Sequence, residues 1–342
     1  MAYNSVGTPR FYVDHGLGMH SLGIENFYYI DPNYGLTYEM LLLNPSVQRN
    51  IVVTGAGDDG DFAHIKIDRV APINYIAVLG HRCDRIYPEF YSGDDSTLPS
   101  NLDSVINGGI GSTGTYPGFT IATFNDVSNY SQAGIVIQEG SQLNAVSIGS
   151  YYDMPHSPDL SLTMEREYGG TKTIETKGGA SLSNSFYNKP PKWGALGAWE
   201  LDWTLNDYYQ NTELSIPAAS YSQTGRRIWS LSFSYLDQRD VFGANPHLIG
   251  GPPWDVQTTP PYNADDLTDD GFLNTDLLTN DNFFSQVIHK TLGGQLPFIF
   301  QPNTSDTNDI NFALCKLDME SFKFDQVANG VYNIKLKIRE VW

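Results

Sequence analysis

The stretch VYNIKLKIREVW, from Val331 to Trp342, alternates between apolar and polar side chains. Consecutive side chains of an extended strand point to opposite faces of the sheet. One face would therefore carry Tyr332, Ile334, Leu336 and Ile338, and the other Asn333, Lys335, Lys337 and Arg339. This strict period of two predicts a strand with one buried and one solvated face.

A second stretch, from Ile228 to Tyr235, repeats the same alternation. It places Trp229, Leu231, Phe233 and Tyr235 on one face and Ser230, Ser232 and Ser234 on the other. A face of three serines can lie flat against a neighbour without burying a charge. The Asn329-Gly330 pair just before the terminal strand predicts a tight hairpin turn.

Shorter runs complete a series of expected strands. They cover residues 50–53, 63–68, 74–79, 119–124, 134–138, 144–151, 160–164, 171–176, 297–300, 311–317 and 321–324. We expect residues 160–164 to pair with 171–176 across Tyr168-Gly169-Gly170. Residues 1–50 read as short strands or covering loops. One helix is expected at about residues 281–292, with Asn280 or Asp281 as its cap and Gly293-Gly294 at its end.

Composition supports a mainly β protein. The chain has 342 residues, 40% apolar, 17% charged and 13% aromatic, with glycine and proline between short apolar runs. This length allows two domains. We predict two β-sandwich or jelly-roll-like domains, at residues 1–150 and 151–342. The second would contain the single amphipathic helix and a long acidic loop at about residues 237–281.

The formal net charge of −19 argues against nucleic-acid binding, which needs a cationic surface. No stretch is long and apolar enough to span a bilayer, and the first residues lack the pattern of a signal peptide. We therefore expect that the chain does not insert into a membrane. We also expect that it folds in a cytoplasm. Cys83 and Cys315 lie far apart in sequence and are expected to be free thiols.

The acidic loop holds seven aspartates and no lysine or arginine between Gly251 and Asp281. Its densest part contains Asp265, Asp266, Asp269 and Asp270. An EF-hand alignment on Gly271 fails, because Thr268 and Leu277 then occupy ligand positions. An irregular calcium site stays open as an alternative, but we expect no metal and no cofactor.

Motifs for catalysis are absent from the sequence. Gly55 to Gly60 fits G-x-G-x-x-G, but a strand-like run follows it where a dinucleotide site needs a helix. No H-E-x-x-H, C-x-x-C or G-x-S-x-G occurs. His81 follows an apolar strand and is best placed for chemistry, although a hydrogen-bonded structural role is favoured. We expect that the protein is not an enzyme.

Two regions resemble bacteriophage structural proteins. The phrase NYIAVLGH, from Asn74 to His81, resembles a strand and turn of phage jelly-roll modules, which are similar to discoidin-like galactose-binding domains. Arg82-Cys83 departs from the Asn-Leu usual in that turn. The succession RRIWSLSFSYL, FFSQVIHKTLGG, PFIF and a final REVW, within residues 225–342, resembles the ring-forming domain of distal tail and baseplate hub proteins. In that family the domain comes first in the chain, whereas here it comes last.

These resemblances imply a structural subunit of a virion, assembled in the host cytoplasm as a homo-oligomeric ring that contacts other tail or baseplate proteins. The residues expected at the assembly interface are Lys335, Lys337, Arg339 and Trp342, with Asp265, Asp266, Asp269 and Asp270 of a neighbouring acidic loop. One alternative is a carbohydrate-binding adhesin whose N-terminal sandwich binds host-surface glycans, which exposed Trp and Tyr around the loops at residues 91–118 would favour. A second is a tail-associated hydrolase.

Overall fold

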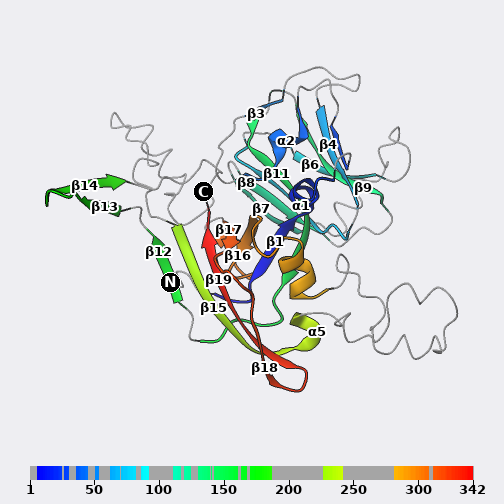
Figure 1. Cartoon of the computed structure of the whole chain (residues 1–342). Coiled ribbons are helices and arrows are strands. Elements are labelled where there is room, and N and C mark those ends of the chain that lie inside the picture. Colours follow the sequence, from blue (N-terminus) through cyan, green and yellow to red (C-terminus); the bar gives the residue numbers. More distant parts are fainter. Residues whose placement is uncertain are drawn as a thin grey trace, which may run out of the picture.

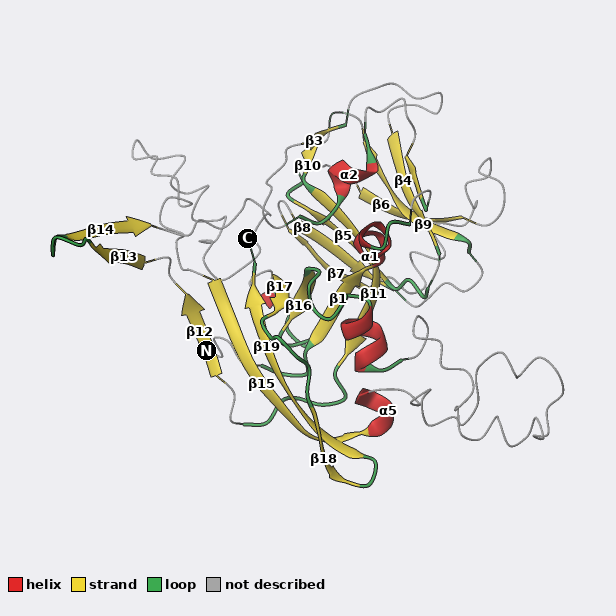
Figure 2. Ribbon diagram, in the orientation of Figure 1, coloured by secondary structure: helices red, strands yellow, loops and turns green. Residues whose placement is uncertain are grey.

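The computed structural model of the chain is a mainly β structure with a few short helices (Figures 1 and 2). It describes residues 6–24, 27–30, 36–44, 51–53, 62–69, 71–81, 86–91, 111–116, 119–124, 130–138, 140, 142–160, 163–167, 170–186, 226–241, 281–307 and 311–341. The β-rich, sandwich-like class predicted from the sequence is confirmed.

The first half of the chain supplies the following strands: β1 (Arg10–Asp14), β2 (Tyr28–Ile30), β3 (Ile51–Val52), β4 (Phe62–Asp68), β5 (Tyr75–Leu79), β6 (Ile86–Tyr91), β7 (Gly111–Tyr116), β8 (Phe119–Thr123), β9 (Gln132–Gln138), β10 (Gln142–Leu143) and β11 (Ala145–Asp153). Two short helices accompany them, α1 (His15–Ser21) and α2 (Tyr38–Leu41).

The second half supplies the remaining strands: β12 (Thr163–Glu167), β13 (Gly170–Glu175), β14 (Ser181–Phe186), β15 (Arg226–Asp237), β16 (Phe298–Gln301), β17 (Ala313–Leu317), β18 (Phe324–Ala328) and β19 (Val331–Glu340). Its helices are α5 (Gln238–Val241) and the π-helix η4 (Phe284–His289).

One large antiparallel sheet runs through both halves of the chain. Its order is β12-β15-β19-β17-β16-β1-β11-β5-β8-β7, with β18 attached to β19. Strand β1 lies between β11 and β16, so an N-terminal strand joins the two halves. The domain boundary predicted at residue 150 falls inside β11, and the two-domain division stays a prediction.

A second sheet makes the first half a sandwich. Its order is β2-β4-β9-β6, and its apolar face packs on strands β5 and β11 of the large sheet. The core between the sheets contains Ile65 and Ile135 on one side and Ile76, Val78 and Ile148 on the other. Strand β5 is apolar along nearly its whole length because both of its faces are covered.

The second half packs its core around β15 and β19. Ile334, Leu336 and Ile338 are buried there, which confirms the face predicted for the terminal strand. The same core contains Phe283 and Val287, so the segment around η4 covers this part of the sheet. The predicted hairpin before β19 is also confirmed, with Gly330 at a φ of 69°.

Two local predictions were wrong. Residues 15–21 form helix α1 rather than a strand or loop, because Asp14 accepts a hydrogen bond from the Leu17 amide and caps the first turn. Residues 160–164 do not pair with 171–176. Instead β12 pairs with β15, and β13 pairs with β14 across a turn at Lys177-Gly178-Gly179. The Gly178-Gly179 pair supplies the turn, with Gly179 at a φ of 78°.

The predicted C-terminal helix exists but is π-helical from Phe284 to His289. Asn282, rather than Asn280 or Asp281, accepts a hydrogen bond from the Ser285 amide at 2.8 Å. Wide π-helical turns are rare and often occur at functional positions. This turn brings Gln286 and Lys290 against β11 and α1.

Candidate assembly face and buried polar groups

The basic residues predicted for assembly lie on the outward face of β19. Lys335 is paired with Ser232 of β15, and Lys337 with Ser230. Directly opposed residues of an antiparallel pair share one face of the sheet. The outward face therefore agrees with the face predicted from the alternation, with serines on β15 beside cations on β19. We call Ser230, Ser232, Ser234, Lys335, Lys337 and Arg339 the outer face.

Two of the three cations hold acidic partners from their own chain. The Lys337 ammonium lies 2.9 Å from the Asp318 carboxylate, and the Arg339 guanidinium donates to Glu167 of β12. Within the described part of the chain Lys335 has no ion pair, and it is exposed. Surface ion pairs of this kind contribute at most about 1 kcal/mol each, so they set local geometry more than stability.

The other predicted interface residues lie outside the described residues. These are Trp342 and the four aspartates Asp265, Asp266, Asp269 and Asp270. The proposed contact between an acidic loop and the outer face thus stays a prediction. The ion pairs at Lys337 and Arg339 leave Lys335 as the cation of this face most open to a further partner.

A β-bulge changes the end of the outer face. The pairing of β15 with β19 shifts between Phe233 and Leu236, so Leu236 takes the next core position. Tyr235, predicted on the buried face, is instead 81% exposed and has a φ of 60°. Bulges of this kind re-aim a side chain. The break of the apolar alternation at Tyr235-Leu236 was the available sequence signal.

A segment before β12 lies along this end of β15. The Asp159 amide donates to the Ser232 carbonyl at 2.7 Å, and its carboxylate accepts from the Ser234 hydroxyl at 2.7 Å. Leu160, the next residue, is fully exposed. The Asp159–Ser234 hydrogen bond therefore holds two exposed apolar side chains, Leu160 and Tyr235, in the same region of the surface.

A cluster of buried polar side chains separates two apolar cores. On one face of β11, Ser150 lies between Ile148 of the N-terminal core and Tyr152 of the C-terminal core. The Lys290 ammonium donates to the Ser150 hydroxyl at 2.9 Å and to the side-chain amide oxygen of Gln286 at 2.6 Å. These contacts join the π-helical segment to the strand that both halves share.

His15 completes the cluster. Its Nε2 lies 2.9 Å from the Ser150 hydroxyl and 3.3 Å from the Lys290 ammonium. Burial, with the nearby Lys290 charge, holds the His15 pKa well below its ordinary value. A neutral imidazole with Nε2 as acceptor fits these contacts. No sequence pattern pointed to this cluster, because its members come from three distant segments.

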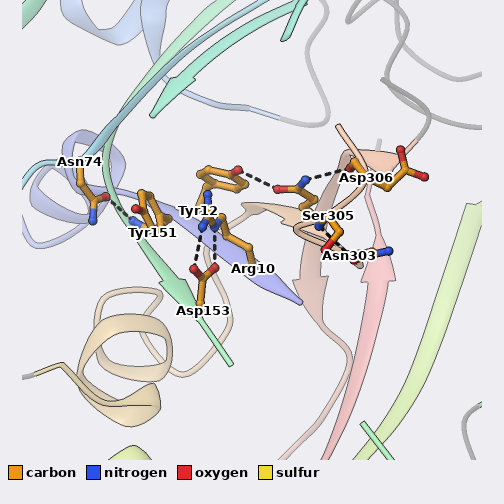
Figure 3. A network of polar contacts seen from close by, with 9 residues as sticks. Arg10, Tyr12, Asn74, Tyr151, Asp153, Asn303, Ser305 and Asp306 are labelled. Atoms are coloured by element: carbon orange, nitrogen blue, oxygen red, sulfur yellow. Dashed lines mark hydrogen bonds and ion pairs between the residues drawn. The ribbon is translucent and has the colours of Figure 1, made fainter. Parts of the chain in front are cut away.

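Another polar network lies where β1 joins its neighbours (Figure 3). Arg10 makes two hydrogen bonds to the Asp153 carboxylate, at 2.5 and 2.6 Å, and its guanidinium lies 3.9 Å from the ring centroid of Tyr151. Tyr12 donates to the Gln301 side chain at 2.8 Å. These bonds tie β1 to β11 on one side and to β16 on the other.

His81 and Cys315 are both buried. The Nε2 of His81 lies 2.8 Å from the Thr120 hydroxyl, and burial lowers the His81 pKa to about 4. Cys315 is a free buried thiol whose pKa burial raises well above its ordinary value. Cys83 and the G-x-G-x-x-G segment lie outside the described residues. The hydrogen-bonded role favoured for His81 is confirmed.

The described residues contain no cluster of three or more potential metal ligands and no helix long and apolar enough to cross a membrane. Comparisons with protein-family models, with curated proteins and with solved structures gave no match.

Proposed function

We propose that the chain is a structural subunit of a bacteriophage virion, placed in a tail or baseplate ring that organises neighbouring proteins. The observation that carries this proposal is the outer face of β15 and β19. These are the longest described strands, of 12 and 10 residues, and they present neutral serines beside cations that are largely paired within the chain.

Such a face suits assembly for a physical reason. Serine hydroxyls can exchange water for a partner's polar groups at low cost, whereas an isolated charge loses its hydration when it is covered. Lys337 and Arg339 already have carboxylate partners. Covering this face with a flat neighbour therefore leaves Lys335 as the one described cation that the neighbour must accommodate.

We also propose that the chain is not an enzyme. Ser150 and Lys290 lie at the separation of a serine–lysine nucleophile and base, which is the strongest catalytic candidate among the described residues. However, Ser150 is 3% exposed and Lys290 is 9% exposed. A nucleophile must reach its substrate, and a hydroxyl enclosed by two cores does not. Their role is to link β11 to the π-helical segment.

The experiment that tests the virion role is detection of the chain in purified particles by mass spectrometry, followed by electron microscopy. We expect the chain at stoichiometric level in symmetric density of the tail or baseplate. Particles that are complete and infectious without the chain would refute this assignment.

A matched pair of variants tests the outer face. Ser230→Glu adds a negative charge to this face, and Leu22→Glu adds the same charge at the exposed end of α1. We expect Ser230→Glu to lower incorporation into particles by about tenfold or more, since each ~1.4 kcal/mol lost in an interface is tenfold in affinity. Leu22→Glu should be incorporated normally. Equal incorporation of both variants would remove the outer face from the assembly contact.

A further inference from the structure

Strands β13 and β14 form a hairpin that extends away from the rest of the molecule (Figure 1). Among the described strands these two pair only with each other, over six residue pairs from Gly170–Phe186 to Glu175–Ser181. Every side chain from Lys172 to Asn184 is exposed. An isolated two-stranded hairpin is only marginally stable in water. A projecting hairpin therefore suggests that another surface stabilises it.

Hydrogen bonds close the turn of the hairpin. The Thr176 amide donates to the Ala180 carbonyl at 2.9 Å, and the Ala180 amide donates to the Thr176 hydroxyl at 3.1 Å. Gly179 occupies the left-handed conformation that the turn requires. These bonds fix the register of the strands and therefore fix which side chains share each face.

The two faces of the hairpin differ in chemistry. Ile174 and Leu182 are directly opposed on one face, where they are 57% and 64% exposed. The other face is polar, with Thr173 opposed to Ser183. An exposed cross-strand pair of aliphatic side chains gains free energy when it is covered. Within the described residues, the Ile174–Leu182 pair is therefore an apolar face without a partner.

The body of the protein presents a matching surface. Leu160 and Tyr235 are both exposed, and the residues that precede them, Asp159 and Ser234, are joined by a hydrogen bond. Tyr235 has a left-handed backbone, a conformation that is strained for a residue other than glycine and that is often found at functional sites. Tyrosines exposed in this way are typical anchors of protein interfaces.

Charge favours the same pairing. Residues 170–186 contain Lys172 and Lys177 against Glu175, which gives the hairpin a net charge of +1 on a chain of −19. The acceptor region is flanked by the carboxylates of Asp159 and Asp237. Opposite charges on the two surfaces would speed their encounter and favour one orientation.

The geometry excludes docking of the hairpin on its own acceptor. Strand β12 runs antiparallel to β15 from Thr163, opposite Ser230, to Glu167, opposite Arg226, and the hairpin begins soon afterwards. The hairpin thus leaves from the Arg226 end of β15, whereas Tyr235 lies nine residues along that strand, roughly 30 Å away. Its six-residue strands reach only roughly 20 Å, and they point away from the body.

We propose that the Ile174–Leu182 face of the β13–β14 hairpin docks on Leu160 and Tyr235 of a second copy of this chain. Donor and acceptor lie at opposite ends of β15, so the contact is head-to-tail. A head-to-tail contact closes into a ring when its rotation permits. This inference rests on the proposed assembly role and names the contact that would build the ring.

Matched variants of the purified full-length chain test the contact by sedimentation velocity over a range of concentrations. Ile174→Asp places a charge on the docking face, and Thr173→Asp places the same charge on the opposite face of the same strand. Tyr235→Gly removes the aromatic anchor and suits the left-handed backbone, so the fold should be kept. We expect Ile174→Asp and Tyr235→Gly to weaken self-association at least about tenfold, and Thr173→Asp to leave it unchanged.

A photo-cross-linking residue at Leu182 locates the contact directly. Equal amounts of isotopically light and heavy chain are mixed and irradiated, and cross-linked peptides are identified by mass spectrometry. We expect light–heavy links to the peptides that contain Leu160 or Tyr235. A wild-type chain that stays monomeric at every concentration, or links that form only within one copy, would overturn the docking.

The outcomes separate this inference from the virion role. A chain found in particle rings but without the Leu182 cross-link keeps its virion role and loses the hairpin contact. A chain that docks in solution through the hairpin but is absent from particles keeps the contact and loses the virion role.

Discussion

The most informative single substitution in the fold is Asp14→Asn. Asp14 ends β1, is 3% exposed, and accepts a hydrogen bond from the Leu17 amide at 3.1 Å to cap α1. Burial raises its pKa from 3.8 to about 7, although hydrogen bonds from Leu17, Gly16 and Ser147 pull it down. Asparagine keeps the size and the capping oxygen of this side chain but does not titrate.

The sign of the effect follows from the two protonation equilibria. The folded protein holds the Asp14 proton more tightly than the unfolded chain does, so its protonated form stabilises the fold. This contribution is complete below about pH 4 and is lost as the pH rises to about 7. At about 1.4 kcal/mol for each pKa unit, the full loss is about 4 kcal/mol.

The assay is urea unfolding of both proteins from about pH 4 to about pH 8, with the free energy of unfolding taken at each pH. We expect the difference, Asp14→Asn minus wild type, to rise by up to about 4 kcal/mol across this range. The lowered pKa of His15 gives a slope of opposite sign below its ordinary pKa of 6.5, but this group is present in both proteins. Difference curves that stay flat with pH would refute the reasoning that Asp14 is protonated in the fold.

Three further predictions concern packing and ligands. Leu336→Asp should lower the free energy of unfolding by several kcal/mol, because Leu336 is 2% exposed and the new charge would be buried. The control Lys335→Glu, at an exposed position of the same strand, should lower it by under about 1 kcal/mol. Equal urea midpoints for the two variants would contradict the register of β19. Gly149→Ala should cost about 1–3 kcal/mol, because its Cβ would lie 2.0 Å from the Val13 carbonyl oxygen, and Gly178→Ala is the neutral control in open space. Chelator should leave the melting temperature unchanged; a large drop would revive the acidic loop as a metal site.

Local alternation was enough to predict the strands that build the C-terminal core. The period of two correctly divided β19 into Leu336 and Ile338 inside and Lys335 outside, because solvent and core impose this pattern residue by residue. It failed at Tyr235, where a bulge inserts one residue and reverses the faces. Periodicity assumes an unbroken ladder, and a bulge is decided by the partner strand.

Long-range partners could not be predicted for the same reason. The sequence around Lys337 and Arg339 does not predict their ion-pair partners, Asp318 and Glu167. The sequence around Ser150 likewise does not predict its hydrogen bond with Lys290. The hairpin was misjudged because Gly169-Gly170 and Gly178-Gly179 offer equally good turns. In the structure β12 pairs with β15, and the turn at Gly178-Gly179 joins β13 to β14.

The central position of β1 has a consequence for how the chain folds during synthesis. Its Tyr12 meets Gln301, which is 289 residues later in the sequence. At a ribosomal rate of 5–20 residues per second, one edge of β1 waits roughly 15–60 s for β16 to emerge. Throughout that interval an apolar strand edge is open to wrong partners. Chaperone dependence of refolding should therefore fall sharply once residues 298–301 are available, which release of nascent chains of graded length can measure.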